Sequence, residues 1–109
     1  MTHIIENRVL KRYIGNDTQF TVPEGVTEIG ENAFLGCFNL TQITIPESVT
    51  KVGGYTFRGC TRLTQISIPQ GLTEIGNGTF KGCFNLTQIN IPEGVTKINY
   101  STFSGCSSL

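Results

Sequence analysis

The sequence has little of what most enzymes and nucleic-acid-binding proteins use. Its single histidine, His3, lies outside every repeated segment, so no serine–histidine or cysteine–histidine dyad is expected. Its 8 basic and 8 acidic residues balance, which gives no electrostatic reason to expect nucleic acid or an anionic membrane as a partner. No apolar run approaches the length of a membrane span, about 18 residues. We therefore predict neither an enzyme nor a protein that inserts into a membrane.

The four cysteines form no CxxC pair, and each is separated from the next by 23 residues. Because the ligands of a zinc site must converge on one point, cysteines at equivalent positions of a repeat are not expected to bind metal. We predict instead reduced, buried thiols that behave as small hydrophobic side chains. No metal and no cofactor is expected.

What the sequence does contain is a 23-residue unit, seen most clearly in the segment IPESVTKVGGYTFRGCTRLTQIS. Five residue types keep this spacing through four successive units. They are proline (Pro23, Pro46, Pro69, Pro92), phenylalanine (Phe34, Phe57, Phe80, Phe103), glycine (Gly36, Gly59, Gly82, Gly105), cysteine (Cys37, Cys60, Cys83, Cys106) and leucine (Leu40, Leu63, Leu86, Leu109). A fixed period of this length is typical of a solenoid, in which stacked coils bury a continuous core.

The chain divides into two parts. Residues 1–17 depart from the unit and alternate apolar with polar side chains on either side of Glu6-Asn7-Arg8, which predicts a β-hairpin that caps the first coil. Residues 18–109 hold four repeats, of which the last is truncated. We expect a β-rich solenoid with right-handed coils, short parallel strands and short helical turns.

Each unit predicts the same local structure. The segment TQITIP and its equivalents alternate polar with apolar residues, which favours a strand that proline ends, with isoleucines such as Ile89 and Ile91 pointing inward. The segment VTKVG and its equivalents predict a second, shorter extended piece. ENAFLGC predicts one helical turn that places Phe34 in the core, and Gly36 is expected to end it in a left-handed conformation.

The pattern IPxxVTxIGxxxFxGCxxLTxIxIP, from about Thr18 to Leu109, resembles the BspA-like leucine-rich repeats of bacterial and protozoan surface proteins. The lead-in LKRYIGNDTQFTVP is also similar to the start of such arrays. The resemblance implies a curved solenoid with its sheet on the inner, concave face, and a role in adhesion or protein binding rather than catalysis. It also implies the cell surface, although the first residues, MTHIIENRVLKRY, show no secretory leader and no anchor is seen.

The first candidate site is a polar ladder on the exposed, concave face of the predicted strands. Repeat proteins generally bind partners through such surfaces. Alternatively, the stacked amides bond to one another and only stabilise the sheet. The residues of the polar ladder are Gln19, Thr21, Gln42, Thr44, Gln65, Ser67, Gln88 and Asn90.

A second candidate is a set of aromatic residues at the edge of the coils. Phe38 and Phe84 follow the cysteine in the first and third repeats, where the other two repeats carry threonine and serine. A position that accepts polar residues is expected to be partly exposed, so these rings either anchor a partner or pack over the corner of the coil. The same two interpretations apply to Tyr55 and Tyr100.

At one further position of the repeat, successive units carry charges of alternating sign. Because stacked positions lie close together, these side chains predict ion pairs between neighbouring coils, with a structural role. The row consists of Glu28, Lys51, Glu74 and Lys97.

The sequence stops at Ser107-Ser108-Leu109 without a capping segment, so the last coil has apolar residues with no neighbour on one side. We expect a fragment of a longer solenoid whose open end packs against a second copy, which predicts a homodimer. The residues of this open end are Val95, Ile98, Phe103 and Leu109.

Three functions remain open at this point. The first is a non-catalytic interaction or adhesion module that binds an unidentified protein ligand. The alternative is a structural unit that assembles with itself through the open end. Carbohydrate binding by the polar ladder is weaker, because few aromatic side chains are expected on that face.

Overall fold

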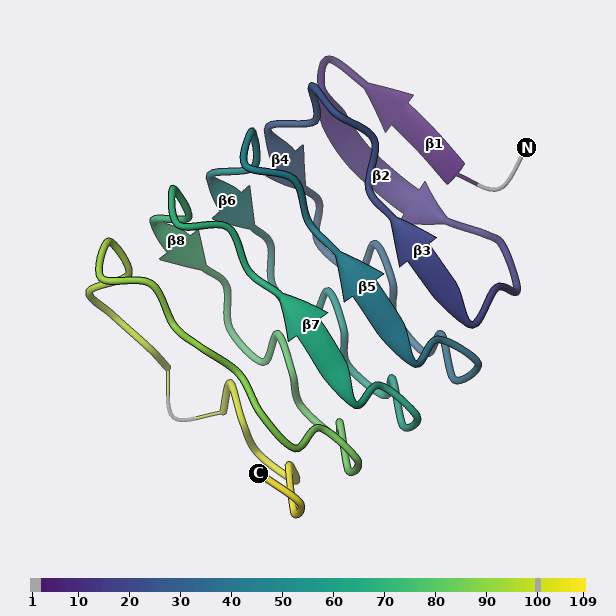
Figure 1. Cartoon of the computed structure of the whole chain (residues 1–109), viewed down its shortest axis with the longest axis vertical. Helices are drawn as coiled ribbons and strands as arrows, with labels where there is room; N and C mark the ends of the chain where they lie inside the picture. The colour runs from purple at the N-terminus through teal and green to yellow at the C-terminus, as the bar shows by residue number, and fades with distance from the viewer. Residues whose placement is uncertain (1–2, 100) are drawn as a thin grey trace.

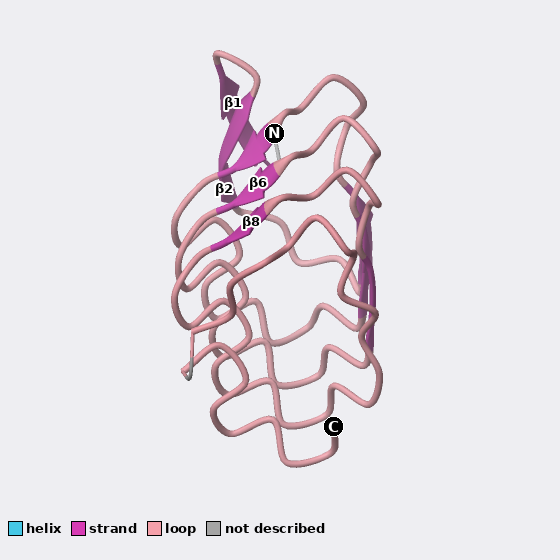
Figure 2. Ribbon diagram, turned by 90° about the vertical axis from the view of Figure 1, so that its left-hand side faces the viewer, coloured by secondary structure: helices cyan, strands magenta, loops and turns pink. Residues whose placement is uncertain are grey.

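The chain winds as a stack of coils, and a computed structural model describes residues 3–99 and 101–109. Figure 1 shows successive coils side by side, running in the same direction from the N-terminal hairpin to the last coil. Strands occupy two sides of the stack, and turns and loops connect them (Figure 2). The described residues contain no helix. The predicted β-rich solenoid with short parallel strands is confirmed.

A three-stranded sheet follows one side of the stack in the order β3-β5-β7. Its strands are β3 (Gln19–Thr21), β5 (Gln42–Thr44) and β7 (Gln65–Ser67). They are parallel, and each residue pairs with the residue 23 positions further along the chain. The apolar middle residue of each strand packs toward the core, whereas the two polar residues beside it are exposed.

A five-stranded sheet follows another side in the order β1-β2-β4-β6-β8. Its first two strands, β1 (His3–Glu6) and β2 (Val9–Tyr13), form the predicted antiparallel hairpin. Asn7 and Arg8 turn it with positive φ angles of 52° and 64°, the conformation that suits a two-residue hairpin turn. The other strands are β4 (Glu28–Ile29), β6 (Lys51–Val52) and β8 (Glu74–Ile75).

The hairpin and the coils share one sheet. Strand β2 pairs with β1 on one side and, in parallel, with β4 on the other. The short strands β4, β6 and β8 correspond to the second extended piece expected in each repeat. The hairpin therefore leads directly into the solenoid ladder, and the division of the chain at residue 17 stays a prediction.

The segment before each repeated glycine is a run of tight turns, which corrects the expected turn of helix. The amide of Phe34 donates to the carbonyl of Thr56 in the next coil at 2.9 Å, and that of Gly36 donates to Arg58 at 2.8 Å. The amide of Leu35, which lies between them, donates to the carbonyl of Asn32 at 3.1 Å and closes a four-residue turn. Because Asn32 and Gly36 have φ angles of 62° and 69°, a right-handed helix cannot continue through them. The corner of each coil therefore bonds to the next coil like a strand.

The repeated glycines at this corner have the left-handed conformation that the sequence predicts. Their φ angles are 69°, 76°, 79° and 79° for Gly36, Gly59, Gly82 and Gly105. Glycine adopts this conformation without the steric cost that a Cβ atom would add. The prediction of a left-handed residue at this register is confirmed.

Aromatic rings form a continuous stack through the core. Neighbouring ring centroids lie 5.2 Å apart for Phe34 and Phe57, 5.5 Å for Phe57 and Phe80, and 5.6 Å for Phe80 and Phe103. Tyr13 continues the stack at its N-terminal end, 5.4 Å from Phe34. Phe34, Phe57 and Phe80 are buried. Each repeat thus adds one ring to a column that links all the coils.

The last coil is bonded less completely than the others. Its corner is in place, since Phe80 donates to the carbonyl of Thr102 at 3.0 Å. The predicted fourth strand is not formed, because its pairing with β7 is limited to one bridge between Gln65 and Gln88. Ile89 and Ile91, expected to point inward, are only half-buried. Within residues 3–99 and 101–109, no further strand pairs with the outer side of this segment.

Replacing Phe57 by alanine should lower the free energy of unfolding by about 3–5 kcal/mol, because a ring buried between two others is lost and a cavity remains. The matched control is Phe103→Ala, which removes a half-buried ring at the end of the same stack and should cost less. Urea denaturation followed by circular dichroism measures both. Equal losses for the two variants would contradict a column held together by its interior rings.

Candidate functional site

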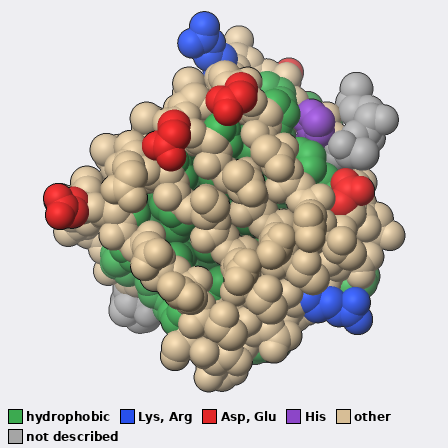
Figure 3. Space-filling view, viewed as in Figure 1, with side chains coloured by type: hydrophobic (Ala, Val, Ile, Leu, Met, Phe, Trp, Pro, Cys, Tyr) green, Lys and Arg blue, Asp and Glu red, His purple; other side chains and the backbone are tan. Residues whose placement is uncertain are grey.

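The polar ladder lies on the three-stranded sheet, and all eight of its residues are exposed. The amide of Gln42 donates from Nε2 to Oε1 of Gln65 at 2.9 Å, so one step of the ladder is bonded side chain to side chain. Figure 3 views the molecule onto this face, which is mainly uncharged, with carboxylates and basic groups around its rim. The surface offers hydrogen-bond donors and acceptors rather than charge.

The face is hollowed over β5, β7 and residues 88–90, with a volume of about 420 Å³. Six of the eight ladder residues line this hollow, whereas Gln19 and Thr21 lie outside it. The full lining is Gln42, Ile43, Thr44, Gln65, Ile66, Ser67, Ile68, Gln70, Gln88, Ile89 and Asn90. The structure thus gathers most of the predicted ladder around one concavity.

The sequence interpretation did not single out Gln70, which also lines the hollow. A signal for it exists, because the other three repeats carry glutamate at this register, as Glu24, Glu47 and Glu93. The third repeat thus departs from the pattern by losing a charge beside the hollow.

The edge aromatics do not form one surface. Phe38 and Phe84 are 61% and 51% exposed, as expected for a position at which the other two repeats carry polar residues. The coil that carries Thr61 lies between them. Tyr55 is half-buried: its ring packs on Gly78, where any side chain would collide with it, and the guanidinium of Arg58 lies 5.6 Å from the ring centroid. Tyr100 lies outside the described residues. A binding role for these rings stays a prediction.

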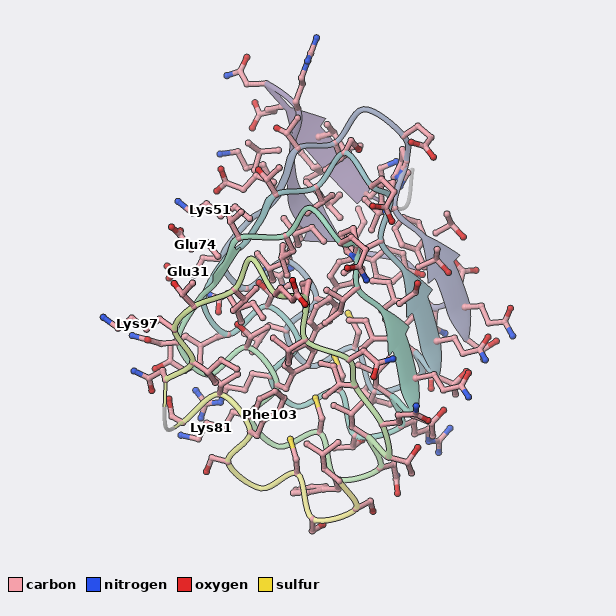
Figure 4. The ribbon with its side chains drawn as sticks, turned by 60° about the vertical axis from the view of Figure 1, so that its left-hand side comes forward. Glu31, Lys51, Glu74, Lys81, Lys97 and Phe103 are labelled. Carbon is pink, nitrogen blue, oxygen red and sulfur yellow. The ribbon has the colours of Figure 1, made fainter. Side chains whose placement is uncertain are left out.

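One ion pair of the predicted row of alternating charge is formed, between Lys51 and Glu74. Lys51 Nζ lies 3.2 Å from Glu74 Oε2, and Figure 4 shows the two side chains together on the outside of the coils. The hydrogen bond to Glu74 raises the pKa of Lys51, and the charges of Glu74 and Glu28 add to this rise. Within residues 3–99 and 101–109 this is the one ion pair, so Lys97 does not extend the row. Both side chains are exposed, so the pair contributes little to stability.

The thiols lie inside the stack and are free. Cys60 Sγ donates to the carbonyl of Phe34 at 3.2 Å, and Cys83 Sγ donates to that of Phe57 at 3.2 Å. Burial raises the pKa of Cys83 to about 12 and that of Cys60 further above its usual range. The described residues contain no group of three potential metal ligands among histidine, cysteine, aspartate and glutamate. These thiols are therefore protonated hydrogen-bond donors rather than nucleophiles.

The open end carries uncovered apolar surface. Ile98 and Leu109 are 44% and 51% exposed, and Val95 and Phe103 are half-buried. The side chain of Thr102 is buried, and its hydroxyl is without a hydrogen-bond partner in the described part of the chain. Figure 4 shows Phe103 at the end of the stack. Association through this surface stays a prediction.

Because both thiols are buried and protonated, we expect Cys60 and Cys83 to react with iodoacetamide at neutral pH only when the chain unfolds. The pKa of Cys83 is raised in the folded chain from its ordinary value of 9.0 to about 12, so the thiol ionises more readily in the unfolded chain. The contribution of this buried thiol to stability is therefore fully present below pH 9.0 and is lost as the pH rises toward about 12. Mass spectrometry of labelled peptides reports the rates. Half-buried Cys37 and Cys106 are the internal controls. Labelling of Cys83 in the native protein as fast as in urea would contradict the assignment.

None of the described segments forms an apolar helix that could traverse a bilayer.

No protein of curated function matches the chain. Several solved structures do. A leucine-rich repeat protein of Treponema pallidum is 29% identical with a TM-score of 0.74, over 93% of this chain and 60% of that protein. A leucine-rich cell surface protein of Faecalibacterium prausnitzii is 29% identical with a TM-score of 0.81, over 95% and 32%. A leucine-rich repeat protein of Bacteroides ovatus is 32% identical with a TM-score of 0.78, over 90% and 28%.

These structures share the repeat fold, and this chain spans 60%, 32% and 28% of their respective lengths. The family model described as "BspA type Leucine rich repeat region (6 copies)" matches residues 4–109. Such solenoids are generally interaction scaffolds rather than enzymes. The stacked coils, the parallel ladders and the match along almost the whole sequence agree: the chain belongs to the BspA-type leucine-rich repeat family.

Proposed function

We propose that this chain is a non-catalytic interaction module that binds a protein ligand through its polar ladder. The observation that carries the proposal is the hollow of about 420 Å³, which six of the eight ladder residues line. A concave surface with convergent polar groups is the usual form of a binding site, and repeat solenoids bind through such faces.

The ladder suits recognition of a neutral partner. Glutamine offers both donors and an acceptor, so exposed glutamines at successive coils present both kinds of group at regular spacing. The bond between Gln42 and Gln65 holds two of the amides in place before a partner arrives, which lowers the entropy lost on binding. The same bond also supports the sheet, so the two interpretations of the ladder are compatible.

The family and its neighbours support a role at the cell surface. One similar structure is described as a leucine-rich cell surface protein, of which this chain spans 32%. A surface location would expose the ladder to partners outside the cell, as adhesion requires. Because the chain spans only part of such proteins, the proposal concerns this segment and the surface that it contributes.

Carbohydrate binding is less favoured, because no aromatic side chain among residues 3–99 and 101–109 lines the hollow. Sugar-binding sites generally stack the apolar face of the ring on an aromatic side chain. The exposed rings Phe38 and Phe84 are not part of this lining.

Replacing Gln42, Gln65 and Gln88 together by alanine should abolish partner binding while the free energy of unfolding changes by about 1 kcal/mol or less, because all three side chains are exposed. The assay is retention of proteins from a solubilised cell-surface extract on the immobilised chain, quantified by mass spectrometry. The matched control replaces Lys51, Glu74 and Lys97 by alanine on the outside of the coils. Unchanged retention by the glutamine variant, or equal loss by the control, would contradict a ligand site on the ladder.

A second candidate function is self-assembly through the open end. The observation that favours it is the exposure of Ile98 and Leu109 beside the uncovered end of the aromatic stack. Apolar surface of this kind is a common basis for association. A second copy would cover it by packing end to end.

The variant Phe103→Glu should convert a dimer into a monomer, because the new charge would be buried in the interface. Light scattering across a dilution series measures the molar mass, and circular dichroism confirms that the variant folds. Phe38→Glu is the control, since Phe38 is exposed on an earlier coil. A wild-type chain that is monomeric at every concentration, or a dimer that persists in Phe103→Glu, would exclude assembly through this end.

A further inference from the structure

The hairpin and the first coil are joined by backbone hydrogen bonds on either side of one corner. Tyr13 N–H donates to the carbonyl of Ala33 at 2.8 Å. Thr41 N–H donates to the carbonyl of Thr18 at 2.7 Å. These bonds fix both ends of the connection from β2 to β3 against the first coil, and Figure 1 shows this connection between the two strands.

Between these two bonds, the hairpin side is shorter than the coil side. It consists of residues 14–17, whereas the first coil uses residues 34–40. The first and second coils match more closely, with residues 35–40 against residues 57–63 between the corresponding bonds. The connection from the hairpin therefore cuts across a corner that the coil follows in full, and a gap is left between the two segments.

The gap is a shallow surface cavity of about 120 Å³, and residues of both segments line it. The ring of Tyr13 packs on Gly15, where any side chain would collide with it. Gly15 also stands 23 residues before Phe38, at the equivalent position. The hairpin therefore places no side chain next to Phe38 at this position, and the cavity stays open beside the ring.

Polar side chains of the lining are held by hydrogen bonds that leave part of their bonding capacity unused. The hydroxyl of Tyr13 donates to Asp17 Oδ2 at 2.7 Å and accepts from the amide of Asp17 at 3.0 Å. Asn39 Nδ2 donates to Asn16 Oδ1. In the described part of the chain, this leaves Asp17 Oδ1 and Asn39 Oδ1 as acceptors and Asn16 Nδ2 as a donor.

An exposed aromatic ring lies beside these polar groups. Phe38 lines the same cavity, with 61% of its surface exposed. A sugar ring has an apolar face, which stacks on aromatic side chains, and hydroxyls at its edge, which both donate and accept hydrogen bonds. The combination of a ring, two amides and a carboxylate around one cavity matches both parts of a sugar.

The other exposed ring at this position of the repeat lacks these neighbours. In the coil before Phe84, Arg62 and Leu63 take the positions of Asn16 and Asp17. The ring, the amide pair and the carboxylate therefore occur together at the first corner and not at the third.

We propose that this corner binds one neutral hexopyranose residue, whose apolar face stacks on Phe38. Asp17 accepts from one hydroxyl of the sugar, and Asn16 donates to a neighbouring hydroxyl. An acidic sugar is disfavoured, because its carboxylate would meet that of Asp17. Sites that enclose a drug-sized ligand have about 300–1,000 Å³, so this smaller cavity holds one sugar residue that stays partly in solvent. The site shares no residue with the hollow, so this inference goes beyond the proposed function.

The probes that test this proposal are the methyl glycosides of glucose, galactose and mannose. Amide signals of the isotope-labelled chain are followed by NMR while each probe is added. At least one probe should give saturable shifts at residues 15–17 and 37–40. Its Kd should be about 1 mM or weaker, because a single sugar makes few contacts. Glycerol is the control, since it offers adjacent hydroxyls without a ring and should give no saturable shifts.

Phe38→Ala should weaken the best probe about tenfold or more, because the stacking surface is lost. Phe84→Ala is its matched control, since it removes an exposed ring at the same position of a later repeat and should leave Kd unchanged. Asp17→Asn keeps an acceptor for the hydroxyl of Tyr13 but replaces one carboxylate oxygen by a donor, and should also weaken binding about tenfold. All three side chains are exposed, so the variants should fold as the wild type does, which circular dichroism verifies.

The outcomes separate this inference from the proposed function. Absence of saturable shifts with all three glycosides, or the same shifts with glycerol, would overturn a sugar site at this corner. Equal weakening by Phe84→Ala would show that exposed rings bind the probes without the corner, and would also overturn it. Saturable shifts at Gln65 and Gln88 instead would assign the sugar to the hollow and overturn both proposals. Retention of a protein by the polar ladder depends on other residues, so its loss in the glutamine variant leaves this test unaffected.

Discussion

The whole structure depends on backbone hydrogen bonds that join each coil to the next and that recur every 23 residues. They run along the two sheets and also through the corners, where the amides of Phe34 and Phe57 donate to the following coil. Because each donor must meet its acceptor one coil further on, an insertion in a single repeat would break several ladders at once. The aromatic column and the buried thiols lie inside this frame and share its spacing.

The same constraint explains where the candidate site lies. A continuous ladder would present a uniform row of amides and hydroxyls, with little to distinguish one ligand from another. The hollow spans β5, β7 and residues 88–90, so it includes the step at which pairing is reduced to one bridge, and it is lined by Ser67 and Gln70, which depart from the repeat. Regular stacking therefore builds most of the lining of the hollow, and the less complete pairing after β7 lies at one side of it.

The sequence predicted the features that each repeat dictates locally. The hairpin, the strands β3, β5 and β7 and the left-handed Gly36 follow from alternation, proline and glycine. The tight turns at the corner were missed because the apolar spacing around Phe34 also fits a helical turn, and only the bonds to the next coil exclude one. The hollow was missed because the repeat predicts a fourth strand like the other three, and its separation from β7 depends on packing between coils.

The central claim is that the ladder is closed as far as β7 and open beyond it. Native-state hydrogen exchange of three equivalent amides, Val22, Ile45 and Ile68, tests it most directly, because only the first two donate to the next coil. The account predicts slow exchange at Val22 and Ile45 and fast exchange at Ile68 under conditions where the protein stays folded. Equal protection of Ile68 and Ile45 would show that the ladder continues into the last coil, and would contradict the account.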